Sequence, residues 1–280
     1  MRIDVGSSDD VRIIQRRRNL HEIAFRLTLE AAGRGLAWTA RDEQEVVGIA
    51  VAHDSEHERY VGDLFVEPSY RGQGVGAALL QMALSGTDEL SHAMLVDPSD
   101  AAALALSLRF GMAPREVLLR LAGAIPREEE LAKMAAGAYR FGVEPIDAEA
   151  HAYALNELDR HACGTTRPAD HAEFAASSCG NTFSLNGECV GYAYVWPDGR
   201  IGPLACASEA YLVQIFAYAL VTLERSYGAS WCTALVPGSN RRIARTALRA
   251  GLRIEESLFL ASETTGRELS AYSAFHKLLL

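Results

Sequence analysis

The feature that most constrains this chain is a set of three glycines at alternate positions, Gly72, Gly74 and Gly76, between an apolar strand pattern and an Ala/Leu-rich helix pattern. Glycines at alternate positions let the backbone approach a ligand closely and turn several N–H groups toward one point. A helix that begins there adds its unpaired amides and the positive end of its dipole. The segment therefore predicts a site for a phosphate or pyrophosphate carried by a small molecule.

Two common classes of phosphate site fit this segment poorly. A P-loop is excluded, because no Lys-Ser or Lys-Thr pair follows the glycines to reach terminal phosphates and Mg²⁺. Gly72, Gly74 and Ala77 satisfy a loose dinucleotide-binding fingerprint, with Asp97 about twenty residues further on. However, residues 67–71 separate the strand from the first glycine, and the upstream segments are typical of antiparallel hairpins. An NAD-dependent oxidoreductase is therefore the least favoured interpretation.

Two motifs resemble the GNAT N-acetyltransferase superfamily. Arg71-x-x-Gly74-x-Gly76, preceded by Asp63-Leu64-Phe65-Val66-x-Pro68, is similar to the loop with which that family binds coenzyme A. Downstream, the stretch from Asp100-Ala101-Ala102-Ala103 to Phe110-Gly111 resembles the family's helix that opens with Asn-x-x-Ala and closes with Gly-Phe. Both motifs occur in the family's order and at its separation. The resemblance implies that acetyl-CoA is the cofactor.

The resemblance also implies which residues bind that cofactor. In the family the acyl thioester lies where two neighbouring central strands separate, and the backbone of the first strand binds it. One N–H of this strand polarises the thioester carbonyl, and such a fixed donor is typically worth ~3–4 kcal/mol. The implied contacts come from the strand, the loop and the starts of two helices: Leu64, Phe65, Val66, Arg71, Gly72, Gln73, Gly74, Val75, Gly76, Ala77 and Asp100.

Acyl transfer to an amine requires a base, because the amine arrives protonated at neutral pH. Asp63 and Glu67 are the carboxylates nearest the implied acyl position, and both share a strand face with Phe65 because side chains alternate. Gly62 stands where spermidine/diamine acetyltransferase-like members have a glutamate base. Asp63 is therefore the first candidate for the base, acting directly or through water, and Glu67 is the second.

The position of the family's general acid also departs from the pattern. The family often has a Tyr seven residues beyond the Asn position, and this chain has Ser107 there. A serine hydroxyl can hydrogen-bond the departing sulfur but is a poor proton donor at neutral pH. Because a free thiol has a pKa of only ~8.5, water is the alternative proton source.

The two halves of the chain repeat one pattern at a constant separation of 140 residues. Val96 matches Val236, Ser99 matches Ser239, Asp100 matches Asn240, and Gly111 matches Gly251. A constant offset across several matches indicates an internal duplication. The glycine loop is not repeated, because the same offset leads to the bulky run Tyr211-Leu212-Val213-Gln214-Ile215-Phe216.

The sequence thus predicts an α/β (α+β) fold of two tandem GNAT-like modules, each with a mixed, mostly antiparallel central sheet flanked by helices. Residues 1–122 are the expected module with the acetyl-CoA loop, 123–137 the linker, and 138–280 a second module lacking that loop. The tail from Glu268 to Leu280 fits either a final strand or a helix.

The net charge, the apolar runs and the spacing of cysteines and histidines limit the classes of partner and ligand that we expect. The net charge of −9 disfavours nucleic-acid binding. No apolar run is long enough to span a bilayer, and no signal-like segment is present, so we expect a cytoplasmic protein without a membrane partner. The five cysteines lack Cys-x-x-Cys spacing, and the histidines match no zinc template, so no metal is expected. A homodimer is compatible with the sequence.

We therefore expect an N-acetyltransferase that moves an acetyl group from acetyl-CoA to an amine by direct attack in a ternary complex. The acceptor is a small-molecule or peptide amine that the sequence does not identify. A non-catalytic protein that binds or senses acyl-CoA is the alternative, because the usual glutamate and tyrosine are both replaced at Gly62 and Ser107.

Overall fold

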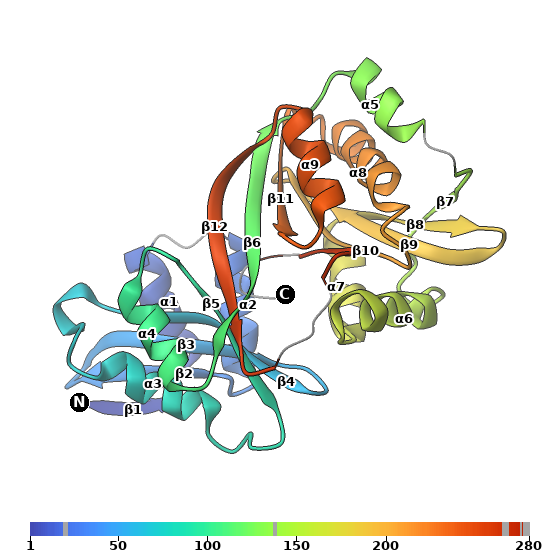
Figure 1. Ribbon diagram of the computed structural model, residues 1–280. Helices are drawn as coiled ribbons and strands as arrows, with labels where there is room; N and C mark the ends of the chain where they lie inside the picture. Colours follow the sequence, from blue (N-terminus) through green and yellow to red (C-terminus); the bar gives the residue numbers. More distant parts are fainter. Residues whose placement is uncertain (19–21, 137–138, 265–268, 275, 277–280) are drawn as a thin grey trace. The chain divides into compact units, whose positions relative to one another are not determined.

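The computed structural model describes residues 1–18, 22–136, 139–264, 269–274 and 276. Within these residues the chain divides into two compact units, shown by their elements in Figure 1. Unit 1 is built from Met1–Arg115 together with Leu260–Thr265. Unit 2 is built from Glu116–Phe259 and Gly266–His276. Each unit therefore contains a segment that is distant in sequence from its main part.

Unit 1 has an antiparallel sheet that ends in one parallel pair. The order β1-β2-β3-β4 is antiparallel throughout, β4 pairs with β5 in parallel, and the end of β12 follows β5. The elements are β1 (Arg2–Val5), α1 (Ser8–Arg18), α2 (Glu22–Gly33), β2 (Ala37–Asp42), β3 (Glu45–Asp54), β4 (Glu58–Val66), the 3-10 helix η1 (Pro68–Tyr70), α3 (Val75–Leu84), β5 (Ser91–Val96) and α4 (Ala101–Arg109).

Helices cover both faces of the unit 1 sheet. On one face, Ile49 and Val51 of β3 share a core cluster with Val11 and Ile14 of α1. The other face packs against α3, where a Cβ added at Gly48 would lie 2.9 Å from the Leu79 Cδ1 atom. A glycine at this position of β3 therefore lets α3 approach the sheet closely.

Unit 2 repeats this order of elements. The strands β7-β8-β9-β10 are antiparallel, β10 pairs with β11 in parallel, and β11 pairs antiparallel with β6. Helices α6 and α7 cover one face of the sheet, and α8 and α9 cover the other (Figure 1). The elements are β6 (Ala113–Ala124), α5 (Glu128–Ala135), β7 (Gly142–Pro145), α6 (Ala152–Cys163), α7 (Pro168–Ser177), β8 (Cys179–Leu185), β9 (Glu188–Val195), β10 (Arg200–Cys206), α8 (Leu212–Tyr227), β11 (Trp231–Pro237), α9 (Arg241–Arg249), β12 (Arg253–Ser262) and β13 (Tyr272–Ser273).

The 140-residue repeat is visible in matching helix caps. The Asp100 side chain caps α4 by accepting a 2.9 Å hydrogen bond from the Ala103 amide, and Asn240 caps α9 in the same way from Ile243 at 3.1 Å. Each helix is followed by a glycine with positive φ, Gly111 and Gly251. Ser/Asn/Asp caps and left-handed glycines are the usual start and stop signals of helices.

The α/β fold with mixed, mostly antiparallel sheets flanked by helices is confirmed by this architecture. Helix α7 begins directly after Arg167 with a proline, which is a usual first residue of a helix. Part of the expected linker forms α5, which packs on α8. Residues 272–273 of the tail form a strand, while residues 268, 275 and 277–280 lie outside the described residues. Of the helices described, none has the length and apolarity needed to cross a membrane.

Replacement of the two matching caps by alanine should have unequal effects on stability. Asp100 is exposed, so Asp100→Ala should cost about 1 kcal/mol of unfolding free energy, the usual value of an N-cap. Asn240 is fully buried and also donates a 2.9 Å hydrogen bond to the Tyr272 carbonyl oxygen, so Asn240→Ala should cost about 2–4 kcal/mol. Urea denaturation of both variants measures the difference, and equal losses would contradict it.

Candidate functional site

A bulge in β4 opens a gap between the two parallel strands of unit 1. The pairing of β3 with β4 shifts register between Val51 and Ala52, which leaves Gly62 as the extra residue of β4. At the same position the parallel pairing of β4 with β5 stops, since its last partners are Val61 and Met94. A bulge bends its strand and increases the local twist. From Gly62 onward β4 therefore keeps only β3 as a paired neighbour.

The register of β4 decides which backbone groups face this gap. The Glu67 amide donates to the Val47 carbonyl oxygen of β3 at 2.9 Å, and the Gly48↔Val66 pair lies next to it. Because N–H and C=O groups alternate along an antiparallel strand, the peptide groups of Leu64 and Val66 point away from β3. The two N–H groups therefore point toward the gap, where the family resemblance implies that the acyl end of the cofactor binds.

The loop after β4 ends at the beginning of α3, with two glycines in the left-handed region. Gly72 has φ +76° and Gly74 has φ +85°, and Gly74 is the N-cap of α3. A Cβ added at either glycine would meet no atom within 4 Å, so their surroundings are open. Positive φ turns the loop amides and the first amides of α3 toward the same side, as in anion-binding nests. This geometry fits the predicted pyrophosphate.

Three side chains hold the loop in place. The Tyr70 hydroxyl donates a 3.0 Å hydrogen bond to Asp42 on β2, and this acceptor raises the pKa of Tyr70. Arg71 Nε donates to the Val66 carbonyl oxygen at 3.0 Å, and Gln73 Nε2 donates to the Ser69 carbonyl oxygen at 2.9 Å. Arg71 and Gln73 are exposed, so the guanidinium of Arg71 is positioned at the surface of the loop.

The other predicted cofactor residues lie on the helices that follow. Val75 is the buried first residue of α3, and Gly76 and Ala77 continue its first turn. A Cβ at Gly76 would be 3.6 Å from Val66 Cγ2 and 3.7 Å from Leu106 Cδ2, so this helix turn sits directly on β4. Asp100 uses its carboxylate to cap α4 rather than pointing it freely into solvent.

The carboxylates proposed as the base lie on the face of β4 that carries α1 and α2. Phe65 packs against the core cluster of Val11 and Ile14, which fixes the face. Asp63 and Glu67 each stand two residues from Phe65, so they lie on the same side of the strand, and both are half-buried. The structure thus brings the two candidate carboxylates to one sheet face beside the gap.

Ser107 lies on α4 with its side chain directed into the protein. The residue is fully buried, and its hydroxyl donates a 2.9 Å hydrogen bond to the Leu104 carbonyl oxygen one turn earlier. A hydroxyl already used in its own helix is a poor candidate for a proton donor. The identity of the acid stays a prediction, and this geometry favours water as the proton source.

His53 lies on β3 with a buried ring nitrogen, although its sequence neighbours are typical of an exposed turn. Its Nε2 atom has no hydrogen-bond partner among the described residues. Burial, followed by the charge of Arg34, lowers the pKa of His53 to about 4. The imidazole is therefore neutral at physiological pH and does not serve as a cationic site.

Unit 2 has no space for a comparable phosphate loop at the start of α8. Residues 207–211 connect β10 to α8, whereas residues 67–74 connect β4 to α3. Tyr139 packs edge-on against Tyr211 with ring centres 4.7 Å apart, and Phe141 lies 5.6 Å from the same ring. Gln214 of α8 donates a 2.7 Å hydrogen bond to the Tyr139 carbonyl oxygen. Aromatic side chains therefore fill this helix end.

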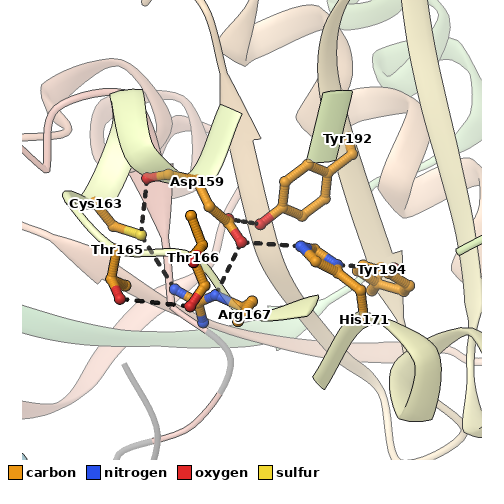
Figure 2. A network of polar contacts seen from close by, with 8 residues as sticks. All are labelled: Asp159, Cys163, Thr165, Thr166, Arg167, His171, Tyr192 and Tyr194. Carbon is orange, nitrogen blue, oxygen red and sulfur yellow. Dashed lines mark hydrogen bonds and ion pairs between the residues drawn. The ribbon is translucent and has the colours of Figure 1, made fainter. Parts of the chain in front are cut away.

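The other notable polar site is a buried network between α6, α7 and β9 of unit 2 (Figure 2). Asp159 lies at its centre and accepts hydrogen bonds from Tyr192, from Arg167 Nε at 3.1 Å and from His171 Nε2 at 2.9 Å. Tyr194 lies 3.1 Å from the other ring nitrogen of His171. Burial raises the pKa of both tyrosines. Among the described residues, no His, Cys, Asp and Glu side chains form a group that could hold a metal ion.

Sequence reasoning missed the bulge, this network and the fixation of the loop by Tyr70. The bulge had a signal, since an isolated glycine such as Gly62 inside a strand pattern often marks one. The network had none, because Asp159 and Tyr192 are separated by an entire helix and strand and meet only in the folded unit.

The lowered pKa of His53 makes a prediction about stability at mild acidity. The unfolded chain binds a proton at His53 below about pH 6.5, whereas the folded chain does so only near pH 4. Stability should therefore fall as the pH drops through this interval, by about 2 kcal/mol between pH 7.5 and pH 5.0. Urea denaturation at pH 7.5 and 5.0 measures the loss, and His53→Gln should reduce it. If the His53→Gln variant lost as much unfolding free energy between these two pH values as the unmodified protein, the result would contradict the prediction.

Comparisons with known proteins agree with the geometry. Residues 10–112 match the sequence model described as Acetyltransferase (GNAT) family. No curated protein sequence matches the chain. A putative acetyltransferase from Pyrococcus horikoshii is similar in structure, with a TM-score of 0.74 at 16% identity, covering 99% of this chain and 95% of that chain.

Two further structures are similar over nearly the same range. A tandem GNAT protein from the clavulanic acid biosynthesis pathway has a TM-score of 0.63 at 16% identity, covering 93% of this chain and 97% of that chain. A GCN5-related N-acetyltransferase from Sphaerobacter thermophilus has a TM-score of 0.62 at 16% identity, covering 93% and 94%. At such identities the similarity shows the fold. Residues 10–112 therefore match the GNAT family model, and the chain has the fold of GNAT proteins over nearly its entire length.

Proposed function

We propose that the protein is an N-acetyltransferase that uses acetyl-CoA bound to unit 1 and transfers the acetyl group to an amine. The observation that carries the proposal is the gap between β4 and β5, which opens at Gly62 and leads to the glycine loop at the start of α3. The family and the fold support acyl transfer in general. Acetyl-CoA as the acyl donor and an amine as the acceptor are part of the proposal and are not specified by the family or the fold.

The residues of unit 1 fit coenzyme A at both ends. A pyrophosphate requires converging N–H groups and open space, which the left-handed glycines Gly72 and Gly74 and the start of α3 provide. A pantetheine arm carries amides that bind an exposed strand edge, and Leu64 and Val66 present such an edge toward the gap. Arg71 adds positive charge beside the loop.

The cofactor supplies an activated acyl thioester, whose carbon–sulfur bond breaks as the amine nitrogen forms the new carbon–nitrogen bond. We assign to the Val66 N–H, which points away from β3, the role of stabilising the negative charge that develops on the carbonyl oxygen. Asp63 accepts the proton that the amine loses, directly or through a water molecule. All five cysteines lie in unit 2, so unit 1 supplies no thiol of its own.

A protein that binds acyl-CoA without turning it over is a second candidate. The observation in its favour is Ser107, whose hydroxyl is committed to the Leu104 carbonyl oxygen. Release of coenzyme A thiol with diamines, aminoglycosides, amino acids and peptide N-termini distinguishes the two functions. Turnover with any of these amines supports the transferase, and tight binding without turnover on all of them supports the sensor.

Substitution of the N-cap glycine of α3 should weaken acetyl-CoA binding. Gly74→Glu places a negative charge and a side chain where the loop amides converge, so we expect affinity to fall at least ~10-fold, or ~1.4 kcal/mol. Gly86→Glu is the matched control, because Gly86 also has positive φ (+72°) and open surroundings but lies after the end of α3. Calorimetric titration measures both. Equal weakening in the two variants would mean that backbone strain, not the loop, causes the loss.

Removal of the proposed base should slow catalysis without affecting cofactor affinity. Asp63→Asn keeps the size of the side chain but removes its proton acceptor, so kcat should fall by ~10²–10⁴. The dissociation constant for acetyl-CoA should stay within about twofold, because the proposed cofactor contacts on β4 are backbone groups. Glu67→Gln is the comparison, and a larger loss in this variant would transfer the role of base to Glu67.

A further inference from the structure

Unit 2 contains the same separation of parallel strands as unit 1, at positions 140 residues later. Parallel pairing of β10 with β11 stops at Ile201 and Ala234, just as pairing of β4 with β5 stops at Val61 and Met94. The pairing of β9 with β10 also shifts register there, between Ile201 and Leu204. The bulge that opens the gap in unit 1 therefore has a counterpart that opens a gap in unit 2.

The gap of unit 2 is filled by the chain's own segment 269–274. Strand β13 pairs antiparallel with β10, with Tyr272 opposite Ala205 and Ser273 opposite Leu204. On the other side, the Ala274 amide donates a 2.8 Å hydrogen bond to the Leu235 carbonyl oxygen of β11. The segment thus lies between the two strands that separate and bonds to both.

The contacts of this segment match those proposed for the cofactor in unit 1. Leu204, Ala205 and Cys206 stand 140 residues after Leu64, Phe65 and Val66, the strand residues implied to bind the acyl end. The Cys206 amide donates a 3.1 Å hydrogen bond to the Ala271 carbonyl oxygen. Val66, the counterpart of Cys206, carries the N–H that we assign to the acyl carbonyl. The Ala271 carbonyl of unit 2 therefore occupies the position equivalent to the reacting carbonyl of unit 1.

Side chains hold the segment from both sides. Tyr272 is 1% exposed, and the Arg167 guanidinium of the buried network lies 5.4 Å from the centre of its ring. Ser273 is fully buried and donates a 3.0 Å hydrogen bond to the Leu235 carbonyl oxygen. The Asn240 amide group donates to the Tyr272 carbonyl oxygen at 2.9 Å. These contacts satisfy buried polar groups that would be costly to leave without a hydrogen-bond partner.

In unit 1 the corresponding gap has no such occupant among the described residues. The strands that pair with β4 are β3 and β5, and those next to β5 are β4 and β12. The N–H groups of Leu64 and Val66 thus face no strand in the described part of unit 1, although Arg71 bonds to the Val66 carbonyl oxygen, whereas the equivalent edge of unit 2 is bonded to β13. The difference lies in one short segment, since the strands around the two gaps follow the same register.

We propose that residues 269–274 are an internal ligand of unit 2, which permanently occupies the channel that unit 1 uses for the acyl and pantetheine part of its cofactor. The comparison with unit 1 rests on the proposed function. Because the β10–β11 gap and the start of α8 are both filled, the chain binds one acyl-CoA and not two. Unit 2 therefore keeps the fold of unit 1, but its own residues 269–274 fill the position of the binding channel and form part of its core.

A disulfide trap tests the position of the segment in the full-length protein. Neighbouring residues on antiparallel strands have Cα atoms about 4.5–5.5 Å apart, within reach of a disulfide. Ala271→Cys places a thiol beside the native Cys206, whereas Ser270→Cys places it one residue away on the same segment. After mild oxidation, peptide mass mapping should show a disulfide between Cys206 and the introduced thiol in the first variant and none to Cys206 in the control. Equal cross-linking in both variants would overturn the proposal.

Two measurements on the unmodified protein keep the proposal falsifiable if the variant does not fold. Hydrogen exchange should show the amides of Cys206 and Ala274 as strongly protected as the central strand β9, because both are bonded across the gap. Rapid exchange of these amides would contradict a permanent occupant. Titration with acetyl-CoA should give one site per chain, and two sites would overturn the proposal. Absence of any binding would refute the cofactor of unit 1, while exchange and trapping would still decide the occupancy of unit 2.

Discussion

Both units depend on one feature of the backbone. In each unit, parallel pairing between two central strands stops at the position where the first of these strands has a bulge. Parallel strands that separate leave rows of N–H and C=O groups without a strand neighbour inside the sheet, and buried backbone groups are almost always paired. Gly62 and Gly202 stand at this point in the two units. The gap therefore requires a partner, and the identity of that partner distinguishes the units.

The two units differ in what pairs with the separated strands. In unit 2, a segment of the chain supplies the missing strand, and aromatic side chains from Tyr139, Phe141 and Tyr211 close the adjacent helix end. In unit 1, glycines keep the helix end open, and the strand edge is available to a molecule with amide and phosphate groups. The buried network around Asp159 contacts the segment through Arg167, whose guanidinium lies 5.4 Å from the centre of the Tyr272 ring, and the Asp159 carboxylate pairs with that buried guanidinium, which would be costly to leave unpaired.

Much of the fold was predictable because its signals are local. The apolar strand before the loop, the Val75–Leu84 helix and the caps Asp100 and Asn240 are each encoded within a few residues. The second unit was predictable because the sequence repeats these local signals 140 residues later. The filled gap was not predictable, because β13 pairs with β10 across more than sixty residues, and a two-residue strand such as Tyr272–Ser273 has no periodic pattern to recognise.

Unit 1 is assembled from segments that are distant in the sequence, and this affects how the protein folds during its synthesis. Its sheet is completed by the end of β12, and Glu263, which follows that strand, is bonded to His92 through both its backbone amide and its carboxylate. These contacts link residues 171 positions apart. Such distant pairing slows folding, because a long loop has to close first. On the ribosome, the unit with the glycine loop therefore cannot complete its sheet until the end of β12 has been synthesised, so chains terminated before that strand would expose an unpaired edge at β5.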